Sequence, residues 1–340
     1  MNKSRIAIRR TGLVTAVGLT SEQSCAAFRA KVTNPTETRY IDSAGEWIVA
    51  HQVPLEQPWR GLVRLVKMAA MAIRQVLQDV SEVQIERLPL LLCVAEVERP
   101  GRTAGLERLL PLIQAEIGSR FAENSAVIAQ GRVAVAVAIE RARSLISEGR
   151  TDQVLVAATD SLLSWPTLGH FERLSRLLTS HNSNGFMPGE ASGALLLGAP
   201  TGGRAEVICA GIGFGLEKAT VDGEAPLRAD GLTQAFRSML ADAGCQMHDI
   251  DFRITDISGE QYYFKEAALA LSRTLRSRKS EFDIWHPAEC TGEVGAVSGA
   301  TMISAAVAAW KNQYAEGRRA VAHMANDAGQ RAALLLQAGP

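Results

Sequence analysis

The sequence lacks the patterns that usually mark a metal centre. Its 340 residues include five cysteines, none of them in a Cys-x-x-Cys pair, and six histidines with no ligand spacing to one another or to cysteine. Structural and catalytic metal sites usually show such spacings, so we expect neither a metal nor a metal cofactor. An odd number of scattered cysteines also predicts reduced thiols in an intracellular protein.

The sequence also lacks an excess of charge of either sign. Lys and Arg together number 36, as do Asp and Glu, which gives a net charge of zero. No global attraction to nucleic acid or to an anionic membrane surface is therefore expected. No apolar run approaches the roughly 18 residues of a membrane helix. These absences predict a cytoplasmic protein with no nucleic-acid or membrane partner.

The first residues contain a pattern that mimics a signal peptide. Basic residues, among them Arg9 and Arg10, precede the short apolar run from Leu13 to Leu19. Thr15 and Gly18 interrupt that run, and polar residues follow at once. A signal peptide needs a longer apolar core, so we favour a buried strand, a turn and a helix here.

Apolar runs alternate with longer Ala- and Leu-rich periodic segments, which is the pattern of a layered α/β fold. The predicted strands are Ile6–Ile8 with Leu13–Ala16, Leu90–Val94, Val154–Ala157, Gly193–Leu197 and Val207–Ala210. The predicted helices are Ser21–Ala30, Gly61–Asp79, Leu106–Phe121, Val133–Glu148, Leu232–Ala243, Lys265–Ser277 and Met302–Asn312. The helix after Gly131 is apolar on nearly every face up to Ile139, which predicts burial between two sheets.

Four blocks of the chain, in order, resemble the ketosynthase branch of the thiolase-like superfamily. They are Ile8–Gly18, Arg132–Ser161, Phe186–Ala191 and Thr291–Ala300. A weak internal repeat, with a Leu triplet closing each half, agrees with this resemblance. The resemblance implies an α/β, thiolase-like fold of two similar βαβαβ-type halves, residues 1–200 and 201–340. Together they would form one body in five layers, α-β-α-β-α.

The residues that ketosynthases use for chemistry differ in this chain. The resemblance places Arg132 at the position of the nucleophilic cysteine, Ser258 and Glu293 at the two histidines, and Ala288 at the lysine. The gating loop is reduced to a short turn that begins at Asn326. We therefore expect no catalytic residue and no cofactor-binding residue, and a vestigial pocket formed by Arg132, Ser258, Glu293 and Asn326.

The resemblance also implies that Arg132 meets Glu293, because the cysteine and second histidine of ketosynthases share one pocket. We predict a partly buried salt bridge between them that plugs this pocket. Breaking a buried pair by removing one partner typically costs about 3–5 kcal/mol. His286 and Trp285 could line the same pocket, although packing at a strand end is the simpler interpretation.

A relocated nucleophile is the alternative that would preserve enzymatic activity. Cys290 lies near the histidine loop, but its acidic neighbours would raise the pKa of its thiol. Cys93 follows three leucines and is more typical of core packing. Ser161, His170 and Asp160 could form a catalytic triad, although Asp160-Ser161 resembles a structural strand end in ketosynthases.

A ketosynthase fold without its chemistry predicts a protein-binding role, through a homodimer or heterodimer. One possibility is a chain-length-factor-like partner of an active ketosynthase. The segments Gly45–Trp47, Pro54–Gly61 and Gly259–Tyr263 resemble thiolase-like accessory proteins of type VI secretion effector clusters. That resemblance implies a co-chaperone that binds an effector, an effector chaperone or a PAAR-type spike protein, and we favour it at this stage.

Overall fold

Ten strands form one mixed sheet whose two halves have the same strand order. The computed structural model describes residues 5–203 and 206–339. In the N-terminal half the order is β5-β4-β6-β7-β1, with bounds β1 (Ile6–Val14), β4 (Leu90–Val94), β5 (Ala126–Ala129), β6 (Gln153–Ser161) and β7 (Glu190–Gly198). In the C-terminal half the order is β10-β9-β11-β12-β8, with bounds β8 (Val207–Leu216), β9 (Phe252–Thr255), β10 (Ile284–Trp285), β11 (Arg319–Ala325) and β12 (Gln330–Ala338).

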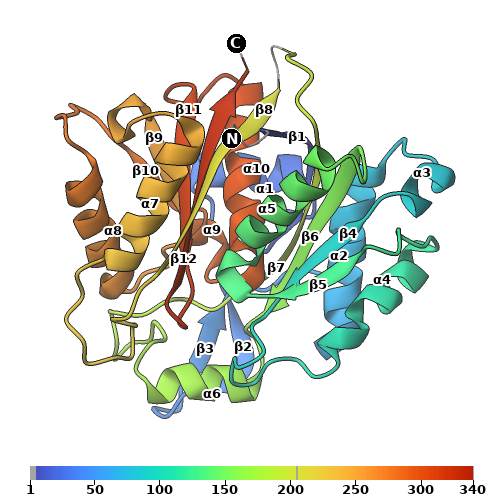
Figure 1. Cartoon of the computed structure of the whole chain (residues 1–340). Coiled ribbons are helices and arrows are strands. Elements are labelled where there is room, and N and C mark those ends of the chain that lie inside the picture. The colour runs from blue at the N-terminus through green and yellow to red at the C-terminus, as the bar shows by residue number, and fades with distance from the viewer. Residues whose placement is uncertain (1–4, 204–205, 340) are drawn as a thin grey trace.

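The two halves join where β1 pairs with β8, along Ile6–Ile8 only. Beyond this contact the two halves of the sheet diverge, and two central helices, α5 (Ala134–Ser147) and α10 (Ser298–Lys311), fill the space between them (Figure 1). The outer face of the N-terminal half is covered by α2 (Gly61–Leu77) and α4 (Leu109–Ile117). The outer face of the C-terminal half is covered by α7 (Asp230–Ala243) and α8 (Gln261–Thr274). The predicted α/β, five-layered, thiolase-like fold is therefore confirmed.

Alternate residues of the covered strands belong to different apolar cores. One core surrounds the two central helices, and one lies under the outer helices of each half. On β6, Val154 and Val156 face the central helices, whereas Leu155 faces α2 on the outside. On β12, Leu334 faces the centre and Leu335 faces α7. Because both faces of these strands are covered, they read as continuous apolar runs, and alternate residues serve different cores.

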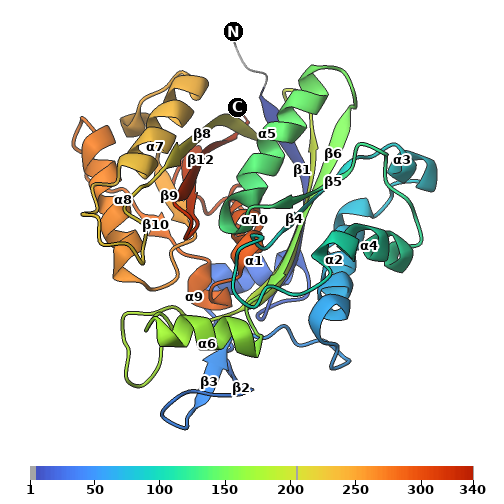
Figure 2. The ribbon, with the colours of Figure 1, turned by 60° about the horizontal axis from the view of Figure 1, so that its bottom comes forward.

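The remaining elements lie around this body. They are α1 (Ser21–Ala30), α3 (Glu82–Glu86), α6 (Trp165–Arg173), α9 (Ala288–Thr291), the hairpin of β2 (Thr36–Ile41) and β3 (Trp47–Ala50), and the 3-10 turns Leu106–Arg108, Gly131–Val133, Met247–Asp249 and Gly295–Val297. The hairpin and α6 lie together at one end of the molecule (Figure 2). No helix in residues 5–203 and 206–339 is long and apolar enough to cross a membrane.

The predicted helices agree with the structure to within a few residues. The two short strands predicted at the start are one strand, β1, which has a bulge between Ile8 and Arg10. α10 begins at Ser298 and not at Met302, because the small residues before Met302 continue the buried helix. The predicted boundary after residue 200 falls in the connection between β7 and β8.

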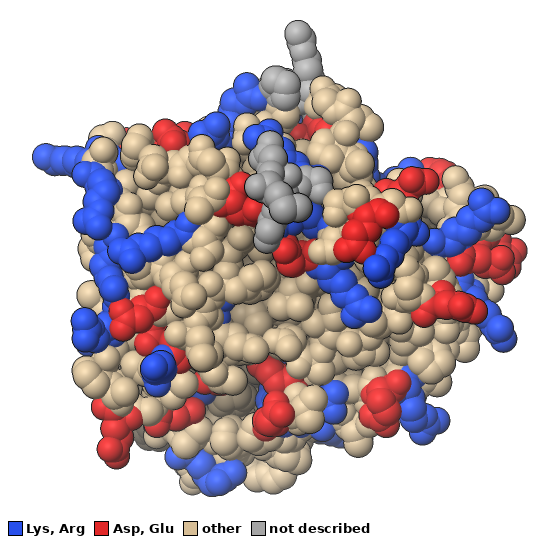
Figure 3. All heavy atoms as spheres, in the orientation of Figure 1, with Lys and Arg blue, Asp and Glu red and all other residues tan. Residues whose placement is uncertain are grey.

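Acidic and basic side chains are interspersed over the face in Figure 3, whose middle is uncharged.

Alternate glycines on β8 let the backbone of α7 lie directly on the sheet. A Cβ atom added to Gly213 would overlap the carbonyl oxygen of Ala235, and one on Gly215 would overlap that of Gly231. Gly211 has the same relation to Met239. The spacing of two residues places all three glycines on one face of the strand, so this helix and strand pack without intervening side chains.

Gly213→Ala should therefore destabilise the fold by about 1–3 kcal/mol, the usual cost of overpacking. The matched control is Gly169→Ala on α6, where no atom lies within 4 Å of the added Cβ. The control should be neutral or slightly stabilising. Urea unfolding of both variants measures the difference, and equal stability losses would contradict the close packing of α7 on β8.

Candidate functional site

The N-terminal ends of the two central helices meet between the halves of the sheet, and Arg132 lies at this junction. Arg132 belongs to the 3-10 turn that precedes α5, and Glu293 lies just before the equivalent turn of α10. Arg132 Nη1 lies 3.1 Å from Glu293 Oε2, and the two side chains are only 7% and 6% exposed. The predicted salt bridge is confirmed, and it is more fully buried than predicted.

Arg132 has further partners that the sequence did not suggest. Its Nη2 atom donates to Asp327 Oδ1 at 2.7 Å and to the Tyr263 hydroxyl at 2.5 Å. The guanidinium also lies over the Tyr263 ring, 4.5 Å from its centroid. The Tyr263 hydroxyl donates in turn to Asp327 at 2.6 Å. The cation is therefore held by a cage of acids and one aromatic ring.

The structure brings the other two predicted pocket residues to the same place. Ser258 Oγ donates to Glu293 Oε2 at 3.1 Å. Asn326 Nδ2 donates to Gln330 Oε1 at 2.7 Å and to the carbonyl of Gln130, two residues before Arg132, at 3.4 Å. Arg132, Ser258 and Glu293 therefore form a direct chain, and Asn326 braces the loop that leads into Arg132.

Arg176 extends the cluster towards the surface. Its Nε atom donates to Glu260 Oε1 at 2.7 Å, and its Nη1 atom donates to Asp327 Oδ2 at 2.8 Å. Asp327 therefore lies between two arginines. The sequence did not point to Asp327, although this residue directly follows Asn326. It did not point to Arg176 either, because Arg176 lies in the loop after α6, outside the blocks that carry the ketosynthase resemblance.

A second arginine–acid pair supports the start of α10. Arg99 donates to both carboxylate oxygens of Asp160, at 2.7 and 2.6 Å. Asp160 Oδ2 accepts the backbone N–H of Ala296 at 2.9 Å, and Glu293 Oε1 accepts that of Gly295 at 2.9 Å. These two acids provide acceptors for N–H groups that have no partner within the helix.

Burial and charge set different pKa values within the cluster. Burial outweighs the effect of Arg132 and raises the pKa of Glu293 to about 7. Burial likewise raises the pKa of Asp256, whose Oδ2 lies 3.9 Å from Arg132 Nε, to about 6. At Asp327 burial acts in the same direction, but Arg132 and Arg176 outweigh it and hold the pKa well below its usual range.

The side chains leave little free space at this junction. A cavity of about 30 Å³ remains, bordered by Arg132, Arg176, Glu293 and Asp327. The cluster formed by Arg132, Arg176, Tyr263, Glu293 and Asp327, called here the Arg132 cluster, therefore fills most of this junction.

The alternative nucleophiles are not activated in this structure. Burial, and secondly Glu289, raises the pKa of the Cys290 thiol to about 11. Burial also raises the pKa of the Cys93 thiol. Within residues 5–203 and 206–339, no cluster of His, Cys, Asp and Glu with the arrangement of a metal site is found.

The proposed triad is not assembled either. Ser161 Oγ donates to Glu190 Oε2 at 3.0 Å, and Asp160 is engaged by Arg99. His170 packs edge-on against Phe171, at 5.3 Å between ring centroids. His286 also lies outside the Arg132 cluster, and its ring contacts Phe264 at 5.5 Å. His286 directly follows β10, which agrees with the simpler interpretation, packing at a strand end, and not with a place in the vestigial pocket.

Comparison with solved structures identifies the fold. The ishigamide ketosynthase/chain length factor superposes with a TM-score of 0.79 at 18% identity, over 99% of each chain. The fold is that of the ketosynthases. The type II polyketide acyl-carrier protein in complex with its ketosynthase, AntDE:AntF, gives a TM-score of 0.80 at 15% identity, over 99% of this chain and 100% of that chain. The ketosynthase ApeO in complex with its chain length factor ApeC, from Xenorhabdus doucetiae, gives 0.78 at 13% identity, over 98% of each chain.

Sequence comparison gives a shorter match to the same fold group. The model of the β-ketoacyl synthase N-terminal domain matches residues 134–199, from the start of α5 to the end of β7. No curated protein sequence matches the chain. The matched segment begins two residues after Arg132, so the sequence match covers the buried helix α5 and does not include Arg132.

Arg132→Met should destabilise the protein by about 3–5 kcal/mol at pH 8, because Glu293 and Asp256 lose the cation nearest to them. Both acids already have folded-state pKa values, about 7 and about 6, above their unfolded values. The folded state therefore binds more protons between about pH 4 and pH 7, and stability falls as the pH rises through this window. Without Arg132, stability should fall more steeply as the pH rises. The stability lost through Arg132→Met should therefore be smaller at pH 5 than at pH 8, and urea unfolding at both pH values measures this difference.

The matched control is Arg150→Met, because Arg150 is 66% exposed and pairs only with Glu148 in the described part of the chain. It should change stability by less than about 0.5 kcal/mol. Glu293→Gln should cost less than Arg132→Met at pH 8, since Arg132 keeps Asp327 and glutamine resembles the protonated acid. Equal losses for Arg132→Met and Arg150→Met would contradict the proposed role of the cluster.

Proposed function

We propose that this protein is a non-catalytic ketosynthase-fold subunit that pairs with a catalytic ketosynthase, as chain length factors do. The observation that carries the proposal is the Arg132 cluster. It occupies the position that the ketosynthase resemblance assigns to the nucleophile, and a guanidinium held by two acids at 3.1 and 2.7 Å has no nucleophilic lone pair to offer. The remaining function of such a fold is to bind protein.

The comparisons support this partner class. Two of the structures that share the fold over nearly their whole length are described as a ketosynthase/chain length factor and as a ketosynthase in complex with its chain length factor. A third is a ketosynthase in complex with its acyl-carrier protein. The present chain matches these structures over nearly its whole length, and the Arg132 cluster fills the position that the ketosynthase resemblance assigns to the nucleophile. Both features are expected of a partner subunit that performs no chemistry of its own.

The edge strand β5 offers a surface for such a partner. Within the described residues it pairs with β4 alone, and its sequence Ala126–Ala129 carries no charge. An edge strand of small apolar residues is a template for pairing with another chain. β5 also leads directly into Arg132, so a subunit bound here would lie beside the Arg132 cluster.

A second candidate function rests on the contacts of residues Gly259–Tyr263. This segment, which resembles type VI secretion accessory proteins, contributes Glu260 to Arg176 and Tyr263 to Arg132. The features that distinguish it from ketosynthases therefore belong to the network that fills the site. This supports an adaptor that binds an effector, its chaperone or a PAAR-type spike protein.

Affinity purification of the tagged protein from its own host, followed by native mass spectrometry, distinguishes the two. We expect a stoichiometric complex with a ketosynthase, and Val127→Lys should abolish it, because a charge on β5 opposes strand pairing. The control is Val83→Lys, at a valine on α3 that is 60% exposed. Val127 packs partly against the apolar core under α2 and α4, so thermal melting of both variants must show that each still folds before the complexes are compared.

Recovery of a secretion chaperone, spike protein or effector in place of a ketosynthase would overturn the first proposal and support the second. Recovery of the protein without any stoichiometric partner would contradict both. A ketosynthase complex that survives Val127→Lys would keep the partner class and reject β5 as its binding surface.

A further inference from the structure

A second, separate cavity lies between α1, β10, α9 and the segment after α10. Its volume is about 320 Å³, at the lower end of the range for small-molecule sites, and it shares no residue with the Arg132 cluster. Its walls include Phe28, Trp285, Pro287 and Tyr314. The Trp285 and Tyr314 rings lie 6.3 Å apart at 26°, so this cavity, called here the aromatic slot, has flat apolar walls.

His286 lines the slot and has a buried ring nitrogen without a partner. Its Nδ1 atom is buried and has no hydrogen-bond partner among the described residues. Burial lowers the pKa of His286, so the ring is neutral and carries one N–H and one lone pair. A ligand hydroxyl would give this atom a partner once the imidazole turns toward the slot, because Nδ1 is not accessible from the slot in this conformation.

The acids and one cation that border the slot already have partners. Glu316 accepts the indole N–H of Trp285 at 3.2 Å, and burial raises its pKa. Glu289 pairs with Lys31 at 3.7 Å. Each acid therefore already has a donor or a cation as its partner.

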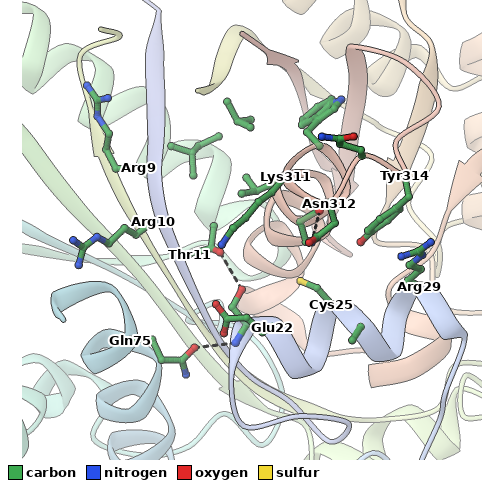
Figure 4. A pocket seen from close by; sticks show the side chains of 18 of the residues that line it. Arg9, Arg10, Thr11, Glu22, Cys25, Arg29, Gln75, Lys311, Asn312 and Tyr314 are labelled. Carbon is green, nitrogen blue, oxygen red and sulfur yellow. Dashed lines mark hydrogen bonds between the residues drawn. The ribbon is translucent and has the colours of Figure 1, made fainter. Parts of the chain in front are cut away.

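Arg29 is the cation that remains available. Its guanidinium lies over the Tyr314 ring, 4.4 Å from the centroid, and no carboxylate pairs with it in residues 5–203 and 206–339. Arg29 and Tyr314 also border a wider cleft of about 1280 Å³, in which Lys311 has no ion-pair partner in the same residues (Figure 4). Arg29 thus borders both the slot and this cleft, which Glu22 and Asp79 also line.

We propose that the aromatic slot binds a small aromatic carboxylate. The ring would lie against Trp285 and Tyr314, and the carboxylate would face Arg29. A hydroxyl on the ring would bond His286 Nδ1 after the imidazole turns toward the slot. This inference goes beyond the proposed function and does not depend on it, because the slot is separate from both the Arg132 cluster and β5.

Isothermal titration of the full-length protein with three matched probes tests the proposal. para-Hydroxyphenylpropanoate should bind saturably. Phenylpropanoate, which lacks the hydroxyl, should bind about 5–10-fold more weakly, since one hydrogen bond contributes about 1 kcal/mol. Tyramine, with an ammonium group in place of the carboxylate, should also bind more weakly than the acid.

Two variants assign the contacts. His286→Phe should abolish the preference for the hydroxylated acid and still bind phenylpropanoate. Arg29→Gln should abolish the preference for the acid over tyramine, whereas Arg141→Gln, an exposed arginine on α5, should leave it unchanged. Absence of saturable binding, equal binding of tyramine and the acid, or indifference to Arg29→Gln would each overturn the proposal.

Discussion

Two helices begin in the interior of this protein, and their first N–H groups need acceptors there. At α10 the acceptors are Glu293 and Asp160, which bind the N–H groups of Gly295 and Ala296. A buried carboxylate is costly unless it is paired, and each of these acids has an arginine, Arg132 or Arg99. The requirement to begin helices inside the fold therefore accounts for the charged centre of an otherwise apolar core.

The same charges connect the two halves of the molecule. Strand pairing between the halves is limited to β1 with β8, and the central helices α5 and α10 pack into one apolar core that both halves share. Arg132 and Arg176 from the first half add a polar connection, because both bind Asp327 from the second. Buried ion pairs often add little net stability, but they strongly penalise arrangements in which a partner is missing. The Arg132 cluster thus constrains how the two halves meet and leaves only a small cavity where they join.

Local signals placed many of the elements, whereas the five-layered architecture was implied by the ketosynthase resemblance. The buried helix after Gly131 and the run Leu90–Val94 were recognised from their apolar residues, and β4 has those bounds. The predicted strands did not include β2, β3, β5, β9, β10, β11 or β12. Of these, β5, β9 and β10 have only two to four residues, too few for a clear pattern.

The Arg132–Glu293 contact was predictable from the ketosynthase resemblance, because both positions belong to recognisable blocks. Asp327, Tyr263 and Arg176 were not, because their meeting depends on how β11, α8 and the loop after α6 are placed in space. Short-range patterns cannot report which of several loops converge at one point.

The central claim is that the Arg132 cluster replaces nucleophilic chemistry. Intact-protein mass spectrometry after incubation with acyl-CoA and with acyl-carrier thioesters tests it most directly. The account predicts the unmodified mass under both conditions, with an active ketosynthase acylated in parallel. A stoichiometric acyl adduct on any residue of this chain would contradict it.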